Sequence, residues 1–436
     1  MLDQFAFELP QAMTHAGQLD PGFAANGKAW VHFEDSTSSL ITGLSLDRTG
    51  RILIAARIET VHGSRFGLTR LNHDGSTDPG FGSHGCVIGA FEQGFEATAG
   101  RVIELPDGHI LLSGLHYENN EHTLPALALF DQQGHAVQNF GNAGRHIIRL
   151  CGHLSQGLRD PWLPPGVPGL EACDMQVQAD GRILLLANHH YQLSDHVGVL
   201  IRLLPDGALD TSFNGRGFVM VRRALKNTWL GCLMLQADGH IVVGGAIDLP
   251  QHGLIARYDS SGKLDDSFGE EGFLSILAQG HSVMVSQIVQ DANGDLQAFG
   301  SSRDPMHSLS LKVRLDGTPD RHCNQGQCQL MAIGRNASQW TAAQLQPDGK
   351  LVTAGATIGG IEADFVLARH LPDTSLDPDF GEGKGWVRTR LGYSLDTARA
   401  VAVSRLTAES WWAATRSKGI IGRWLRGIGP ESDCRG

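Results

Sequence analysis

The sequence predicts an all-β fold, a seven-bladed β-propeller of four-stranded antiparallel blades, from three observations. Glycine is abundant at 55 residues, which suits many short strands joined by tight turns. The 3.6-residue periodicity of amphipathic helices is absent. A phrase built around a phenylalanine recurs as "LDPGFAANGK" at Leu19, "TDPGFGSHGC" at Thr77, "LDTSFNGRGF" at Leu209, "LDDSFGEEGF" at Leu264 and "LDPDFGEGKG" at Leu376.

The repeat period sets the size of each unit. Each unit has a glycine in its first turn, and these glycines are separated by 58, 73, 58, 55 and 55 residues. They are Gly50, Gly108, Gly181, Gly239, Gly294 and Gly349. A unit of this length has room for four strands of roughly six residues and their turns. An open β-solenoid would repeat about every 20–30 residues, so stacking of blades around an axis is favoured.

Each unit is read as four strands in order. The first runs into an Asp-Gly or Asn-Gly turn and the second leaves it, as in "LQPDGKLVTAG", because these residues tolerate the positive φ of tight hairpins. The third strand carries an arginine, and the fourth follows the phenylalanine phrase. We expect the arginines to be structural, pairing with turn carboxylates or with carbonyls between blades; they are Arg70, Arg202, Arg257, Arg314, Arg369 and Arg423.

The phrases "LDxxFGxxG", "LQPDGKLVTAG" and "FVLARHLPDTSLD" resemble the bacterial delta-sixty repeat, which is a propeller-type repeat of about this length. The resemblance runs from Leu19 to about Leu425 and is degraded around Cys323 and Trp411. It implies the architecture, but it does not assign a function, because propellers host lyases, hydrolases and binding platforms alike.

The two ends of the chain are predicted to meet. The chain begins with a segment typical of an outermost strand, "GKAWVHF" from Gly27 to Phe33, and ends with only three strands of a blade. Pairing of the N-terminal strand with the C-terminal blade would close the ring and leave no open sheet edge. The predicted organisation is an N-terminal extension at 1–18, one propeller at 19–426 with an inserted top-face loop at 151–174, and a C-terminal tail at 427–436.

Composition narrows the class of partner. The formal net charge of -11, with no basic run, argues against a nucleic-acid binder. No apolar stretch reaches the length of a membrane span, and the first residues show no secretory signal. Seven irregularly spaced cysteines do not indicate a disulfide framework. The expectation is therefore a monomeric cytoplasmic protein, with export by another route left open.

Candidate site residues are sought where the repeat fails. The longest interval holds an inserted segment, 151–174, which is rich in proline and contains Trp162, an aromatic of the kind that anchors interfaces. Top-face loops with histidines and carboxylates flank it. The predicted binding residues are Trp162, His116, His189, His190, Glu118 and Asp195.

Histidine beside carboxylate suits Zn²⁺, yet no HExxH and no paired CxxC supports a closed site. We therefore expect no cofactor, while a divalent metal stays possible and no catalytic residue is assigned. The predicted function is a non-catalytic platform that binds a protein or a glycan through its top face. The alternative is a metal-assisted lyase or hydrolase that uses the same histidines and carboxylates.

Overall fold

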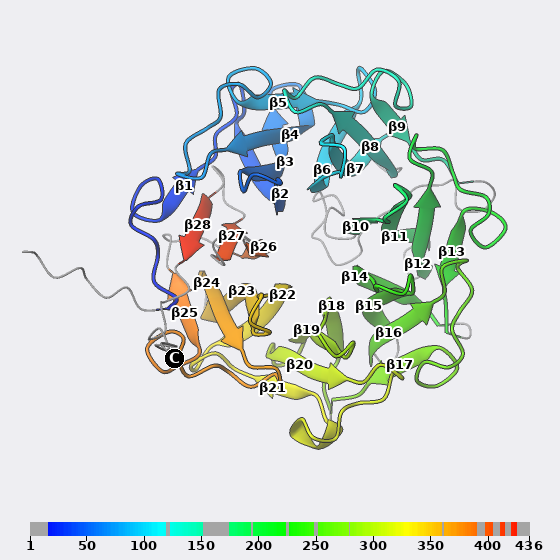
Figure 1. Cartoon of the computed structure of the whole chain (residues 1–436), viewed down its shortest axis with the longest axis vertical. Coiled ribbons are helices and arrows are strands. Elements are labelled where there is room, and N and C mark those ends of the chain that lie inside the picture. Colours follow the sequence, from blue (N-terminus) through cyan, green and yellow to red (C-terminus); the bar gives the residue numbers. More distant parts are fainter. Residues whose placement is uncertain are drawn as a thin grey trace, which may run out of the picture.

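The protein is described by a computed structural model that covers residues 16–118, 123–150, 174–192, 195–223, 226–247, 252–278, 280–359, 362–389, 397–403, 410–414 and 420–424. Within these residues the strands form four-stranded antiparallel sheets that stand as blades around a central axis (Figure 1). In each blade that is built from one continuous stretch of chain, the strand nearest the axis is the first strand in chain order.

Six blades are each built from one continuous stretch of chain. The first two contain β2 (Ser38–Leu46), β3 (Ile52–Thr60), β4 (Gly63–Leu71) and β5 (Cys86–Gly89), then β6 (Glu96–Glu104), β7 (Ile110–Tyr117), β8 (Thr123–Phe130) and β9 (Arg145–Ile147). The next two contain β10 (Asp174–Val177), β11 (Ile183–Gln192), β12 (Asp195–Leu203) and β13 (Phe218–Val221), then β14 (Thr228–Leu235), β15 (Ile241–Ile247), β16 (His252–Tyr258) and β17 (Phe273–Ile276). The last two contain β18 (Val283–Gln290), β19 (Leu296–Ser302), β20 (Ser308–Val313) and β21 (Gln329–Met331), then β22 (Ala337–Leu345), β23 (Leu351–Gly359), β24 (Glu362–His370) and β25 (Trp386–Thr389).

The remaining sheet is a composite of both ends of the chain. Its order is β1 (Lys28–Trp30), β28 (Ile420–Trp424), β27 (Ser410–Ala414) and β26 (Ala398–Val403), and Ala29 stands opposite Ile421. The predicted fold class is corrected here: seven copies of one unit were expected, whereas six blades are continuous four-stranded units. The outer strand of the composite sheet, β1, comes from the N-terminal part of the chain and pairs with β28.

The hydrophobic core lies between neighbouring blades. Between the β2–β5 and β6–β9 blades, apolar residues of both sheets form one buried cluster that includes Leu53, Phe66, Phe81, Leu112 and Phe130. The phenylalanine of the recurring phrase thus fills the space between blades, and each fully buried side chain of this size contributes about 1.5–3 kcal/mol. Repetition of the phrase repeats this interface around the ring.

The turn after each first strand is fixed by aspartate and glycine. Asp47 Oδ1 accepts hydrogen bonds from the amides of Thr49 and Arg51, both at 2.9 Å. Gly50 has φ 85°, a conformation that glycine adopts without strain. These turns lie on one face of the ring; we call the opposite face, where the inner strands begin, the top face.

The worn copy of the phrase around Cys323 forms a short 3₁₀ turn, Asn324–Gly326, instead of the usual bend. In the described part of the chain, no helix is both long enough and apolar enough to cross a membrane.

Candidate functional site

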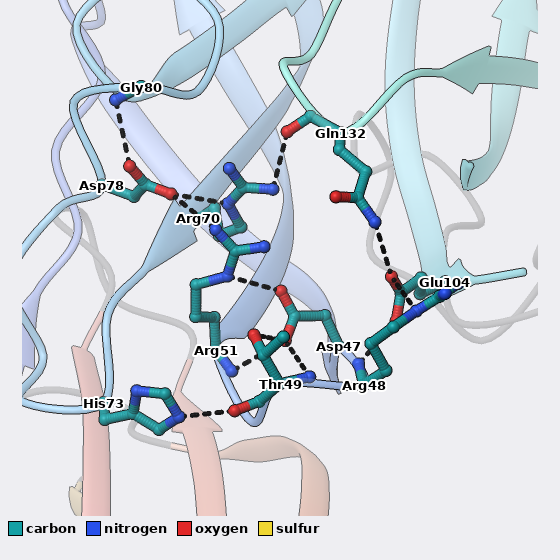
Figure 2. Close-up of polar contacts among 10 residues, drawn as sticks. All are labelled: Asp47, Arg48, Thr49, Arg51, Arg70, His73, Asp78, Gly80, Glu104 and Gln132. Carbon is teal, nitrogen blue, oxygen red and sulfur yellow. Dashed lines mark hydrogen bonds and ion pairs between the residues drawn. The ribbon is translucent and has the colours of Figure 1, made fainter. Parts of the chain in front are cut away.

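The strand arginine that recurs from repeat to repeat is part of a polar cluster that joins neighbouring blades (Figure 2). Arg70 Nε donates to Asp78 Oδ2 at 2.8 Å, and a terminal nitrogen of Arg70 donates to the Gln132 carbonyl of the next blade at 2.7 Å. Its guanidinium carbon lies 4.7 Å from the centroid of the Phe81 ring. Partial burial raises the pKa of Asp78, but the Gly80 amide and Arg70 outweigh it and hold that pKa below its usual value.

The same cluster recurs in three more blades, so the structural role predicted for these arginines is confirmed there. Arg202, Arg257 and Arg369 each donate through Nε to an aspartate, Asp210, Asp265 and Asp377, at 2.6–2.8 Å. Each guanidinium also lies over the phenylalanine of its own phrase, Phe213, Phe268 or Phe380.

Two blades depart from this pattern. In the β18–β21 blade the equivalent position is Lys312, not the expected Arg314, and its ammonium lies 3.2 Å from Asp291 and 3.4 Å from the Pro372 carbonyl of the next blade. In the β6–β9 blade an apolar pair, Leu129 and Val137, replaces arginine and aspartate. In the blades of Arg70, Arg202, Arg257 and Arg369 the repeated charge is therefore used within the scaffold. Arg314 is exposed instead, and the side chain of Arg423 lies outside the described residues.

Among the predicted site residues, His116 and Glu118 lie near the top of the β6–β9 blade. His116 is within β7, not in a loop; it is fully buried, and burial lowers its pKa. Its Nε2 is 3.8 Å from the Glu92 carboxylate, and its ring lies 5.0 Å from that of Phe95. Glu118 forms an ion pair with Arg149.

The other predicted residues are placed less fully. His189 is buried within β11, opposite Val197 of β12, and His190 stands opposite His196 in the same register. The side chains of His190 and Asp195 lie outside the described residues, as do Trp162 and the inserted segment up to residue 173. Over the part of the chain that the structure describes, no three His, Cys, Asp or Glu side chains form a group that could hold a metal ion.

Sequence reasoning missed a set of residues at the propeller axis. Six of the inner strands carry an irregularity against their second strand that leaves one or two residues unpaired. The partly exposed residues at these bulges are Thr42, Arg101, Gly231, Ser286, Thr341 and Arg399. In five of the six, both flanking residues are buried, so the bulged residue is the one that meets solvent. Bulges re-aim side chains and are over-represented next to functional sites.

The inner strand β10 carries a carboxylate at this level instead of a bulge. Asp174 accepts hydrogen bonds from Arg101 Nε at 3.1 Å and from the Leu233 amide at 2.9 Å, so it links three successive blades. It directly follows the inserted segment. We call Asp174 together with the six bulge residues the axial ring; its inner strands surround the centre of the molecule in Figure 1.

The axial ring can recognise an anionic group. The Arg101 side chain is 26% exposed, and its Nε is paired with Asp174. Its two terminal amino groups form no hydrogen bond with any residue that the structure describes. A guanidinium in this state can receive a carboxylate through two parallel bonds. The Ser286 hydroxyl lies at the same level, whereas Thr42 Oγ1 is buried and Thr341 Oγ1 donates to the Ala398 carbonyl at 2.6 Å.

Four segments of the chain match the family described as "Domain of unknown function (DUF5122) beta-propeller", at residues 48–81, 178–213, 236–268 and 346–380. The chain therefore contains DUF5122 beta-propeller repeats. No curated protein matches it.

Similar solved structures have diverse descriptions. A protein of unknown function from Dyadobacter fermentans has 10% identity over 94% of this chain and 100% of that chain, with a TM-score of 0.47. The polysaccharide lyase Uly1 has 10% identity over 94% and 100%, with a TM-score of 0.49. Drosophila Semaphorin 1a, extracellular domains 1–2, has 10% identity over 91% and 88%, with a TM-score of 0.48. Similarity at this level does not indicate a shared activity.

Proposed function

We propose that this chain is a non-catalytic propeller that binds a protein or a glycan through its top face, with the axial ring at the centre of the recognition surface. We also propose that its DUF5122 repeats are of the delta-sixty type, on the phrases quoted above. The observation that carries the binding role is the axial ring, because it is where the blades differ from one another at a shared structural position.

The contrast with the opposite face supports this choice. On that face, the repeated arginines already donate hydrogen bonds to aspartates and to carbonyl groups of the next blade. At the axis, Arg101 and Arg399 occupy two of the bulges, while hydroxyls or glycine occupy the others. A surface that varies between copies of an otherwise repeated scaffold suits recognition, which requires a specific pattern of donors and acceptors.

The metal-assisted alternative is not favoured by a specific observation. Its two fully described histidines, His116 and His189, are buried within strands. The ligand we expect carries a carboxylate or another anionic group that pairs with Arg101, either on an acidic glycan or on an acidic protein segment.

Arrays of acidic and neutral oligosaccharides, and of acidic and neutral peptides, test the proposal with the full chain. Removing a charge-assisted hydrogen bond weakens binding by about 1.5–3 kcal/mol, so Arg101→Gln and Arg399→Gln should each reduce binding of acidic probes by roughly 10-fold or more. Arg321→Gln, an exposed arginine on the opposite face, is the matched control. Unchanged binding by both axial variants, or no binding by the wild type, contradicts the proposal.

A further inference from the structure

A second candidate site lies away from the axis, between the β18–β21 and β22–β25 blades. A cleft of about 440 Å³ is present there, lined among others by Arg335, Asn336, Glu382, Lys384, Trp386 and Arg388. Its volume falls within the range of about 300–1,000 Å³ that is usual for small-molecule sites.

The cleft is locally cationic in a chain that is acidic overall. Three basic side chains and one carboxylate line it, although the chain has a formal net charge of -11. Arg388 is partly neutralised by Asp364, at 3.6 Å. Arg335 and Lys384 are exposed and form no ion pair with any residue that the structure describes. The cleft therefore favours an anion.

The wall of the cleft is aromatic. Trp386 is half-buried, and the Lys384 ammonium lies 5.9 Å from the centroid of its ring. Opposite the ring, residue 334 is glycine, and a Cβ at this position would lie 3.8 Å from the outer edge of the indole. A larger side chain at residue 334 would cover this edge, so glycine leaves the indole open to the cleft. The neighbouring Asn336 side chain adds a donor and an acceptor.

Two other blade junctions carry an ion pair at the corresponding position. At each of these junctions, one charged residue follows the outer strand of a blade. Its partner precedes the outer strand of the next blade. Glu34 pairs in this way with His84 at 3.3 Å, and Arg223 pairs with Glu270. At the cleft the corresponding residues are Arg335 and Glu382, which form no ion pair with each other. Among the residues that the structure describes, the Arg335 guanidinium therefore has no carboxylate partner at this junction.

We propose that this cleft binds a carboxylated sugar. An indole provides an apolar surface for the C–H face of the ring, Asn336 can bond hydroxyl groups, and Arg335 with Lys384 can receive the carboxylate. A phosphate or sulfate ion alone would leave most of the volume and the indole uncovered. A mono- or disaccharide unit with a carboxylate fills both.

Titration calorimetry of the full chain with digalacturonate, and with the neutral disaccharide galactobiose, tests this site. We expect digalacturonate to bind at least 10-fold more tightly than galactobiose. Arg335→Gln and Trp386→Ala should each weaken its binding by at least 10-fold. Arg321→Gln is the matched control, and unchanged thermal unfolding of each variant checks the fold.

Three results would overturn the proposal: no binding of digalacturonate by the wild type, equal binding of the neutral disaccharide, or full binding by Arg335→Gln. Displacement of digalacturonate by inorganic phosphate at equal concentration would also overturn it, since the site would then be a simple anion site. Arg101→Gln should leave this binding unchanged, so failure at the cleft and failure at the axial ring are separate results.

Discussion

Replacing Arg202 with leucine tests whether the repeated arginine cluster holds neighbouring blades together. The side chain is only 7% exposed, and its Nε lies 2.8 Å from Asp210. It also donates to the Ser260 carbonyl of the next blade and to Ser212 Oγ, and lies over the Phe213 ring at 4.5 Å. Arg202→Leu leaves Asp210 with Arg182 as its remaining basic partner, at 3.1 Å.

Removing one partner of a buried ion pair destabilises a protein by about 3–5 kcal/mol when the other charge is left unpaired. Because Arg182 still pairs with Asp210, we expect Arg202→Leu to lower the free energy of unfolding by no more than about 3 kcal/mol. The chain itself shows how the loss can be offset. At the equivalent positions the β6–β9 blade has Leu129 and Val137, and the backbone bond between them is kept. We therefore expect the double variant Arg202→Leu, Asp210→Val to recover to within about 1–2 kcal/mol of the wild type, since apolar replacement of a buried pair is often neutral.

Urea unfolding followed by tryptophan fluorescence measures both variants. Arg321→Leu, an exposed site, should shift the midpoint little. The reasoning is refuted if the single variant is as stable as the wild type, or if adding Asp210→Val restores none of the lost stability. The first result would mean that the cluster does not contribute, and the second that the aspartate is not the source of the penalty.

Three further results are expected. Deleting residues 1–34 removes β1 together with the fully buried Phe33 and exposes the edge of β28, so the soluble yield should collapse in a sedimentation assay. Trp30→Ala, at a 52% exposed site, should have little effect. A soluble deletion variant with an unchanged melting temperature would contradict this prediction. Burial lowers the pKa of His370 to about 4. Between pH 6.5 and 4 the unfolded chain therefore binds more protons than the folded chain, so the free energy of unfolding should fall by roughly 3 kcal/mol as the pH is lowered through that window. In His370→Gln, measured by urea unfolding at several pH values, this fall should be absent. Burial also raises the pKa of the Cys232 thiol, so a thiol reagent should label Cys232 only after unfolding, and labelling of the native protein would show that this interface opens.

The scaffold could be predicted from sequence because each repeat contains the residues that form its turns and its contacts with the next blade. The Asp-Gly turn fixes a hairpin, the phenylalanine fills the space between blades, and the arginine finds its aspartate eight residues later, as Arg70 finds Asp78. Where the repeat sequence is degraded, the prediction chose the wrong residue. Lys312 was missed because the nearest arginine, Arg314, lies two residues further along the chain.

The candidate site could not be predicted in the same way. His116 and His189 were expected in loops because strands of about six residues were assumed, whereas β7 has 8 residues and β11 has 10, which brings both histidines inside strands and buries them. The axial ring depends on contact between blades: a Cβ on Gly43 would meet the Gly100 carbonyl at 2.5 Å, so adjoining inner strands touch at the bulge. Such contacts between segments far apart in the chain leave no local signature.

The central claim is that recognition occurs at the axial ring, and hydrogen–deuterium exchange of the full chain with and without the best array ligand tests it most directly. The account predicts slower exchange in peptides that cover the inner strands β2, β6 and β22 at Thr42, Arg101 and Thr341, with no change in the turns of the opposite face. Protection confined to those turns or to the outer cleft, with the inner strands unchanged, would contradict it.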